Sequence, residues 1–280
     1  MRSTSRIMLF ILITGLALLA PEATVRAAEP NDGNWPQFRG ADSTGVSSNA
    51  GLPDRWSETE NVEWKAEVPG RGWGSPVVRG DNVFVTAVVN SGETEPLRKG
   101  LYFGGDRPER QKSEHEWKVV CLELKSGKVR WEKTVHKGRP SSSIHLKNSY
   151  ASETPATDET HLYATFGNVG IYCFDFDGNE IWNHPIAPQP TRFGWGTASS
   201  PVLHGDRLYY QYDNDEQSYL LALDKRTGKP IWNVERDEKS NWSTPFVWTH
   251  DARTEVVTVG TRAVRSYDMD GNLLWSLKGM

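Results

Sequence analysis

A tryptophan follows a glycine-containing turn at four places in this chain: Trp131, Trp182, Trp232 and Trp275. The intervals between them are 51, 50 and 43 residues. A glycine turn that leads into a short apolar segment is typical of a β-hairpin. Repetition at such a spacing indicates a solenoid or a propeller, in which every repeat packs on its neighbours. We therefore expect these four tryptophans to be structural, each holding one repeat against the next.

A second marker recurs in step with the tryptophans. Ser-Pro or Thr-Pro recurs in every repeat and usually opens an apolar run, with the prolines at Pro76, Pro155, Pro201 and Pro245. The third repeat is the clearest, and its runs are 200–203, 207–212, 218–223 and 230–234. Runs that are apolar on both sides indicate sheets stacked between other sheets. The predicted fold is all-β, a β-propeller of four-stranded antiparallel blades with about four blades, fewer than a seven- or eight-blade ring.

The chain divides into three predicted parts. Residues 1–27 have the pattern of a signal peptide, with Arg2 and Arg6 before the apolar run 7–20 and a small-residue cleavage site at 25–27. That run is shorter than the ~20 residues that a spanning helix needs, although an uncleaved anchor is an alternative. Residues 28–61 form an extended segment, and residues 62–280 hold the propeller repeats. We expect an exported protein, periplasmic or extracellular, with no membrane span after signal removal.

Three segments lie outside the regular repeats. The segment 28–61 is expected to be a strap packed by aromatic residues, among them Trp35 and Trp56. Residues 62–68, with Trp64, resemble a fourth strand without its first three, so we expect them to complete a blade from the other end of a ring. The first repeat has a charged insertion at about 90–116, which is either functional or disordered. Four repeats and one extra strand predict the first part of a longer propeller, whose open edge could self-associate.

Charge and cysteine content narrow the function further. Without residues 1–27 the chain has 29 Lys and Arg against 35 Asp and Glu, a net charge of −6. This acidity and the lack of a basic stripe argue against nucleic acid as a partner. Cys121 and Cys173 occupy equivalent third-strand positions, too far apart in adjacent blades for a disulfide. We expect both to be free, buried thiols.

The inner strands of the blades contain the candidate site. Aligning the repeats on the proline places a hydroxyl before it each time: Ser75, Thr154, Ser200 and Thr244. Crowding near the axis explains such small residues. Glu153 breaks this pattern, and a buried carboxylate needs a partner, a metal ion or water. In the structural interpretation, the Glu153 carboxylate forms an ion pair with Lys147 or an arginine.

Two blade entrances repeat an aromatic residue between glycines, at 71–74 and 193–196. Such glycines allow close backbone approach, and tryptophans at a funnel mouth suit flat or sugar-like ligands. No metal-ligand spacing, phosphate loop or nucleophile elbow occurs, so we assign no catalytic or metal residues. The predicted binding residues are Arg71, Trp73, His145, Lys147, Asn148, Tyr150, Glu153, Trp195 and Trp242.

The glycine-turn-tryptophan segments with their Ser-Pro or Thr-Pro openings resemble the repeats of pyrroloquinoline-quinone-like (PQQ-like) β-propellers over residues 62–280. The stretches 35–46 and 144–155 resemble a secreted bacterial branch of that family. One group of relatives, the quinoprotein alcohol dehydrogenases, implies eight blades, PQQ, calcium, an aspartate base and a disulfide between adjacent cysteines. This chain has half the blades and no adjacent cysteines. The other, the propeller lipoprotein of the barrel-assembly machinery, implies a binding scaffold with a lipidated cysteine, which is missing here.

These observations predict a non-catalytic exported scaffold that binds a small molecule or a protein through one end of its funnel, without a cofactor. The alternative is a quinone-dependent dehydrogenase acting on alcohols or sugars, with PQQ and calcium as cofactors and Glu153 as a calcium ligand. An inactive fragment of such an enzyme is a third interpretation.

Overall fold

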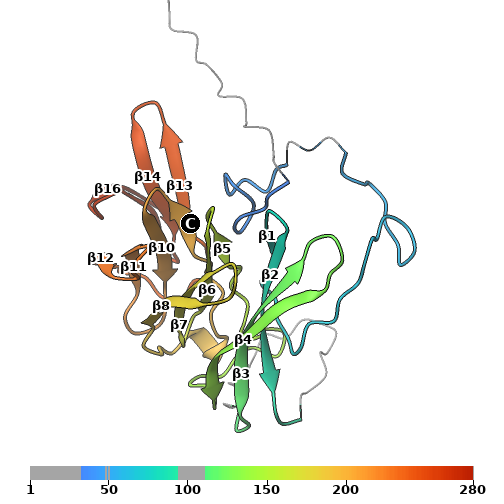
Figure 1. The fold of residues 1–280 in the computed structure, drawn as a ribbon. Helices are drawn as coiled ribbons and strands as arrows, with labels where there is room; N and C mark the ends of the chain where they lie inside the picture. Colours follow the sequence, from blue (N-terminus) through green and yellow to red (C-terminus); the bar gives the residue numbers. More distant parts are fainter. Residues whose placement is uncertain (1–32, 48, 50, 94–110, 280) are drawn as a thin grey trace, which may run out of the picture.

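The computed structural model describes residues 33–47, 49, 51–93 and 111–279. The predicted signal peptide at 1–27 and most of the insertion at 90–116 lie outside the described residues. Within them the chain forms four antiparallel four-stranded sheets, which we call blades 1 to 4 (Figure 1). Their only helical segment is a short 3-10 turn, Arg192–Gly194. The predicted all-β class is confirmed.

The strands follow one another along the chain within each blade. Blade 1 contains β1 (Val77–Arg79), β2 (Asn82–Asn90), β3 (His115–Glu123) and β4 (Val129–Gly138). Blade 2 contains β5 (Ala156–Thr157), β6 (His161–Phe166), β7 (Gly170–Asp175) and β8 (Glu180–Pro185). Blade 3 contains β9 (Val202–His204), β10 (Arg207–Tyr212), β11 (Tyr219–Asp224) and β12 (Pro230–Glu235). Blade 4 contains β13 (Phe246–His250), β14 (Arg253–Val259), β15 (Ala263–Tyr267) and β16 (Leu273–Lys278).

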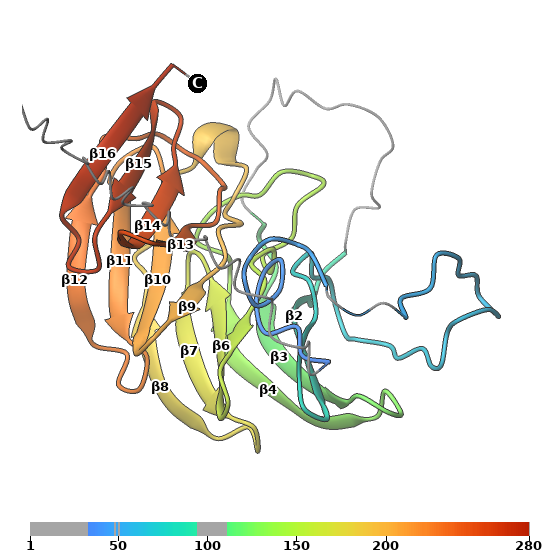
Figure 2. The ribbon, with the colours of Figure 1, turned by 90° about the horizontal axis from the view of Figure 1, so that it is seen from above.

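The blades are arranged as a partial propeller. Figure 2 shows the four sheets fanned side by side, with β4, β8, β12 and β16 along the outer arc. The first strands of successive blades contact one another in the order β1, β5, β9 and β13. The predicted blade order, with inner first strands and outer fourth strands, is therefore confirmed.

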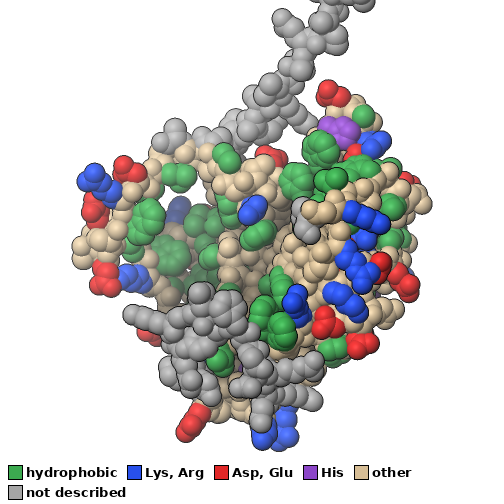
Figure 3. Space-filling model, turned by 180° about the vertical axis from the view of Figure 1, so that it is seen from behind, with side chains coloured by type: hydrophobic (Ala, Val, Ile, Leu, Met, Phe, Trp, Pro, Cys, Tyr) green, Lys and Arg blue, Asp and Glu red, His purple; other side chains and the backbone are tan. Residues whose placement is uncertain are grey.

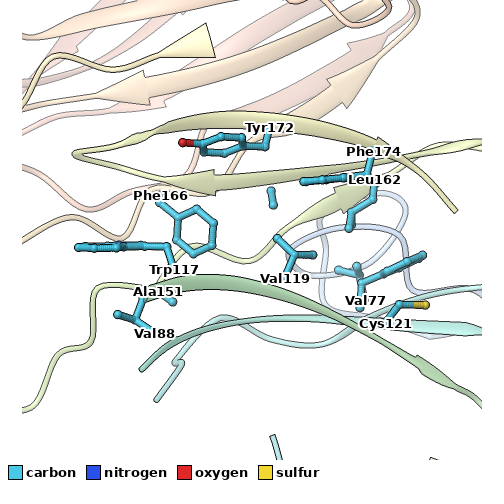
Figure 4. Packing of buried hydrophobic residues seen from close by; sticks show 12 residues of the cluster. Val77, Val88, Trp117, Val119, Cys121, Ala151, Leu162, Phe166, Tyr172 and Phe174 are labelled. Atoms are coloured by element: carbon cyan, nitrogen blue, oxygen red, sulfur yellow. The ribbon is translucent and has the colours of Figure 1, made fainter. Parts of the chain in front are cut away.

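Apolar layers between neighbouring blades form the core. Between blades 1 and 2, Trp117 and Val119 of β3 face Phe166 of β6 and Phe174 of β7 (Figure 4). Separate layers fill the space between blades 2 and 3 and between blades 3 and 4. Each middle strand is buried on both faces because alternate side chains enter different layers. This explains the unbroken apolar runs in the sequence.

The repeat tryptophans connect one blade to the next. The indole Nε1 donates a hydrogen bond to a backbone carbonyl of the following blade, from Trp131 to Phe176 at 2.8 Å, from Trp182 to Lys225 at 3.0 Å and from Trp232 to Met269 at 2.8 Å. Each ring lies on the glycine of that blade's last turn, so a Cβ at Gly228 would be 2.5 Å from Trp182. The glycine is required for space as well as for its positive φ of 68°. These contacts are the ones that the predicted packing role requires.

Two further tryptophans modify this pattern. Trp64 donates to the Leu124 carbonyl at 2.8 Å, and its ring covers Gly127 at the last turn of blade 1. It occupies the position of an outer-strand tryptophan from a preceding blade, although residues 62–68 form no assigned strand. Trp275 instead donates to the Glu255 carboxylate of its own blade, at 2.7 Å. The predicted role of Trp275 as a link to another blade is therefore not seen.

The hydroxyls before the prolines connect the inner strands. The Ser75 N–H donates to Thr154 Oγ1 at 2.9 Å, the Thr154 N–H to Ser200 Oγ at 3.0 Å, and the Ser200 N–H to Thr244 Oγ1 at 3.1 Å. The hydroxyls of Thr154, Ser200 and Thr244 thus each accept a backbone hydrogen bond from the preceding blade. Small size explains these positions only in part, because the structure adds a hydrogen-bonding reason.

The N-terminal strap crosses the inner strands of three blades. Trp35 pairs with Val78 of β1, the Pro36 carbonyl accepts the Thr157 N–H of β5 at 2.7 Å, and Gln37 Oε1 accepts the Leu203 N–H of β9 at 3.2 Å. The expectation that Trp56 helps to pack this strap is wrong, because its side chain is 72% exposed. In that part of the segment, no contact with the inner strands buries the Trp56 ring.

The remaining expectations concern the cysteines and the membrane. Cys121 and Cys173 are free and buried on the third strands of blades 1 and 2, and burial raises the pKa of each thiol to about 12. Both are therefore protonated and unreactive at neutral pH. In the described part of the chain, no helix has the length and apolar character to span a membrane.

Candidate functional site

An aromatic cluster lies where the inner strands of blades 2, 3 and 4 begin. It consists of His145, Phe193, Trp195 and Trp242. The Trp195 ring is 5.6 Å from that of Trp242, 5.3 Å from Phe193 and 5.4 Å edge-on from His145, measured between centroids. Aromatic pairs at such distances contribute attraction beyond their buried area. Residues nearly 100 positions apart in the sequence therefore form one aromatic surface.

Hydrogen bonds hold the backbone beneath this cluster. The Trp195 carbonyl accepts the Asn148 side-chain amide at 2.8 Å and the His145 N–H at 3.2 Å. Trp242 Nε1 donates to the Gly196 carbonyl at 2.7 Å. Because loops from three blades share these bonds, the cluster is positioned by the propeller itself.

Phe193 is the most exposed ring of the cluster. Its backbone has φ 55° and ψ 15°, a left-handed conformation that is unfavourable for a phenylalanine. The side chain is 39% exposed, with the Arg192 guanidinium 5.1 Å from the ring centre. Such strain is found mainly where the surrounding structure imposes it, often at ligand-contacting loops.

Glu153 lies beside the cluster and is only 1% exposed. Its carboxylate accepts the backbone N–H groups of Ser152 and Gly167, both at 3.2 Å, and a hydrogen bond from the Thr197 hydroxyl. Burial raises the pKa of Glu153 to about 7, and these neutral donors limit the rise. The expected ion pair with Lys147 or an arginine is not found, since no described cation forms a salt bridge with Glu153.

A small pocket, about 20 Å³ in volume and partly open to solvent, lies next to Glu153. Gly167 and Thr197 lie between the pocket and the carboxylate. Trp117, Tyr150 and Phe166 supply aromatic walls, and the polar lining includes Ser141, Ser142, Ser149 and Asn168. The Tyr150 hydroxyl donates to the Ser142 carbonyl at 2.8 Å, which fixes one wall.

The structure brings together only part of the predicted binding set. His145, Asn148, Trp195 and Trp242 meet in the cluster, Tyr150 lines the adjacent pocket, and Glu153 lies behind the pocket's Gly167. Trp73 is 48% exposed, and no ring contact joins it to the cluster among the described residues. Arg71 forms a backbone bridge with Val88, and the Lys147 N–H donates to His145 Nδ1 at 3.1 Å.

Sequence reasoning missed the residues that close the pocket. Asn168, at the turn between β6 and β7, donates to Ser142 Oγ at 2.6 Å and accepts the Tyr212 hydroxyl. Thr197 follows the second glycine-flanked aromatic, and that spacing was the one available signal for it. Asn168 gave no signal, because an asparagine in a tight turn has an ordinary structural explanation.

Charged side chains of both signs are spread over the surface of the molecule. Figure 3 shows acidic and basic side chains together on one face, with apolar side chains gathered at its upper right and in the hollow on its left. Over the described ranges, no group of three or more His, Cys, Asp or Glu side chains is placed to hold a metal ion. A fully buried ion pair, Asp213 with Arg236 at 2.8 Å, lies between blades 3 and 4 and also binds Thr258.

Comparison with solved structures supports this architecture. Quinohemoprotein alcohol dehydrogenase from Comamonas testosteroni matches with a TM-score of 0.56 and 13% identity, over 88% of this chain and 41% of that one. The enzyme ADHIIG from Pseudomonas putida HK5 matches with a TM-score of 0.53 and 13% identity, over 88% and 40%. BamB from Moraxella catarrhalis matches over 79% of this chain and 68% of that one, with 14% identity and a TM-score of 0.44. At these identities the two dehydrogenases show the fold alone, and this chain spans about 40% of their length.

Sequence comparison gives the family. No protein of curated function matched the chain. A family model described as outer membrane protein assembly factor BamB matches residues 112–233 and again residues 167–280. The two matches together cover more than half of the chain and overlap across blades 2 and 3, as expected for repeats. The chain belongs to this family of PQQ-like β-propeller proteins.

Proposed function

We propose that this is an exported propeller that binds a small molecule or a protein without catalysing a reaction. The aromatic cluster at one end of the inner strands is the contact surface. The observation that carries this proposal is Phe193, an exposed aromatic held in left-handed backbone above two packed tryptophans. A rigid aromatic surface binds with little loss of conformational entropy. The description of the matched family as an assembly factor favours a protein partner.

The alternative is a quinone-dependent dehydrogenase with PQQ and calcium, which the similarity to quinohemoprotein alcohol dehydrogenases keeps open. Calcium requires six to eight oxygen ligands, mostly carboxylates, carbonyls and water. Both oxygens of Glu153 accept N–H donors, and a hydroxyl donates to the same carboxylate. These residues therefore do not fit the expected calcium ligand, and we derive no catalytic step from them.

A ligand screen tests the binding proposal. Saturation-transfer NMR on the full chain, with a panel of flat aromatic compounds, saccharides and aromatic peptides, should give signals that Phe193→Ala abolishes. Trp56→Ala is the matched control, because that exposed aromatic lies away from the cluster and its loss should leave the signals unchanged. Signals that survive Phe193→Ala, or a panel without any signal, would contradict the proposal.

A second measurement separates the alternative. PQQ and calcium should produce neither stoichiometric uptake, followed by absorbance, nor dye reduction with alcohols or sugars. Tight uptake with dye reduction would establish the dehydrogenase instead.

A further inference from the structure

The pocket beside Glu153 is lined by several oxygen atoms that can accept hydrogen bonds. Three of the lining hydroxyls already donate their protons to protein atoms: Tyr150 donates to the Ser142 carbonyl, Ser141 to the Asn168 carbonyl, and Thr197 to Glu153. One side-chain N–H of Asn168 is likewise donated to Ser142 Oγ. The Thr197 oxygen, which lines the pocket, keeps lone pairs after donating its proton. A ligand that reaches Thr197 Oγ1 must therefore bring a donor of its own.

A negative charge lies directly behind the pocket. A Cβ at Gly167 would be 2.2 Å from Thr197 Oγ1 and 2.7 Å from Glu153 Oε1, so these atoms are packed against the same glycine. All described partners of the carboxylate are neutral. The hydroxyl of Tyr210 is buried without a partner among the described residues, and the Glu153 charge helps to raise the pKa of Tyr210. The charge of Glu153 is thus left without a compensating cation from the described residues.

We propose that this pocket binds a primary ammonium group, which donates a hydrogen bond to Thr197 Oγ1 while Thr197 donates to Glu153. This chain of two hydrogen bonds transmits the carboxylate charge to the ligand, and neighbouring bonds in such a chain strengthen one another. The inference rests on the proposed binding function and specifies the ligand chemistry next to the aromatic cluster.

The walls of the pocket favour an organic cation over a metal ion. The partly exposed ring of Tyr150 offers a surface for cation–π attraction, and Ile144 and Val169 offer apolar contacts for a methylene chain. The opening to solvent allows the rest of a longer amine to extend outward. A neutral alcohol of the same length would make the apolar contacts but lacks the charge.

Titration calorimetry of the full chain with n-butylamine and n-butanol tests this proposal. At about pH 8 the amine is protonated and Glu153 is ionised. The amine should bind saturably, and the alcohol should bind at least tenfold more weakly. Nα-acetyl-lysine amide in the same titration tells whether a lysine side chain of a partner protein also enters or whether the site takes free amines only.

Two variants locate the binding. Glu153→Gln removes the charge at similar size, and Thr197→Val removes the connecting hydroxyl at similar shape, so each should weaken amine binding at least tenfold. Glu159→Gln is the control, since this carboxylate is 78% exposed on the far side of blade 2 and its loss should have no effect. Circular dichroism spectra establish that each variant is folded.

Equal affinity for amine and alcohol, or wild-type amine affinity in folded Glu153→Gln and Thr197→Val, would overturn the ammonium site. The outcome is separable from the broader proposal. Suppose that the calorimetry shows no preference for the amine, while Phe193→Ala still abolishes the NMR signals of the ligand panel. The aromatic cluster would then remain the contact surface, and only the ammonium pocket would be rejected.

Discussion

At the scale of single residues, Glu153 is the group whose environment departs most from its chemical preference. Its carboxyl is buried among neutral donors, and burial raises its pKa from the ordinary 4.5 to about 7. Its backbone carbonyl also contacts blade 1, where a Cβ at Gly74 would approach it to 2.4 Å. Glu153 therefore contacts blade 1 through its backbone carbonyl. Through its carboxylate it contacts Thr197, which lies in the loop before blade 3.

The first prediction follows from that pKa. Because the folded pKa exceeds the unfolded one, the folded state holds the proton more tightly between pH 4.5 and 7, so stability is full below that range and declines as pH rises through it. The wild type should lose about 3 kcal/mol relative to Glu153→Gln across this range. Urea unfolding of both proteins at several pH values measures the difference. Parallel pH profiles would contradict it.

At the scale of elements, the contact between blades repeats as a unit. A strand-two aromatic packs on the strand-four tryptophan, as with Tyr163 and Trp182 at 5.9 Å, and the indole then reaches the glycine turn of the next blade. Blade 4 departs from this arrangement. Val257 stands where blades 1 to 3 have an aromatic, and Trp275 bonds Glu255 instead.

The second prediction concerns this contact. Trp182 is 8% exposed, so Trp182→Ala should lower the free energy of unfolding by about 3–5 kcal/mol through lost burial and a cavity. Trp56→Ala, at a 72% exposed position, should change it by less than about 0.5 kcal/mol. Urea denaturation of both variants gives the comparison. Similar losses in the two would refute the docking role.

The third prediction concerns the inner-strand hydroxyls. Ser200→Ala leaves the buried Thr154 N–H without its acceptor and should cost about 1–3 kcal/mol. Ser200→Thr keeps the hydroxyl, as the equivalent Thr154 and Thr244 do, and should be close to neutral. Denaturation midpoints distinguish the two. If alanine and threonine behave alike, small size alone explains the position.

At the scale of the whole molecule, two kinds of contact stabilise the fold. One is the packing between neighbouring blades, and the other is the N-terminal strap that crosses the blades. The strap binds Val78, Thr157 and Leu203, one residue in each of the first three blades. Trp64 covers the outer turn of blade 1 from the other side. The two segments thus stabilise the beginning of the repeat array.

The fourth prediction follows from this arrangement. In a repeat protein each unit contacts only its neighbours, so Trp64→Ala should loosen blade 1 and leave blades 3 and 4 nearly unchanged. Hydrogen exchange followed by mass spectrometry should show faster exchange in β3 and β4 and wild-type exchange in β10 and β14. A uniform increase over all blades would show that the array unfolds as one unit instead.

The repeat sequence by itself determined the blades, their order and the strand that holds each tryptophan, because hairpin turns and alternating burial are local properties of the chain. It also predicted the free cysteines from their equivalent positions. The tertiary structure alone decided which predicted site residues meet. Trp195 and Trp242 come together while Trp73 does not, and Asn168, which no motif marked, closes a pocket together with Thr197. Those contacts depend on how loops from different blades converge, and that convergence is set by the angle between packed sheets rather than by neighbours in the chain.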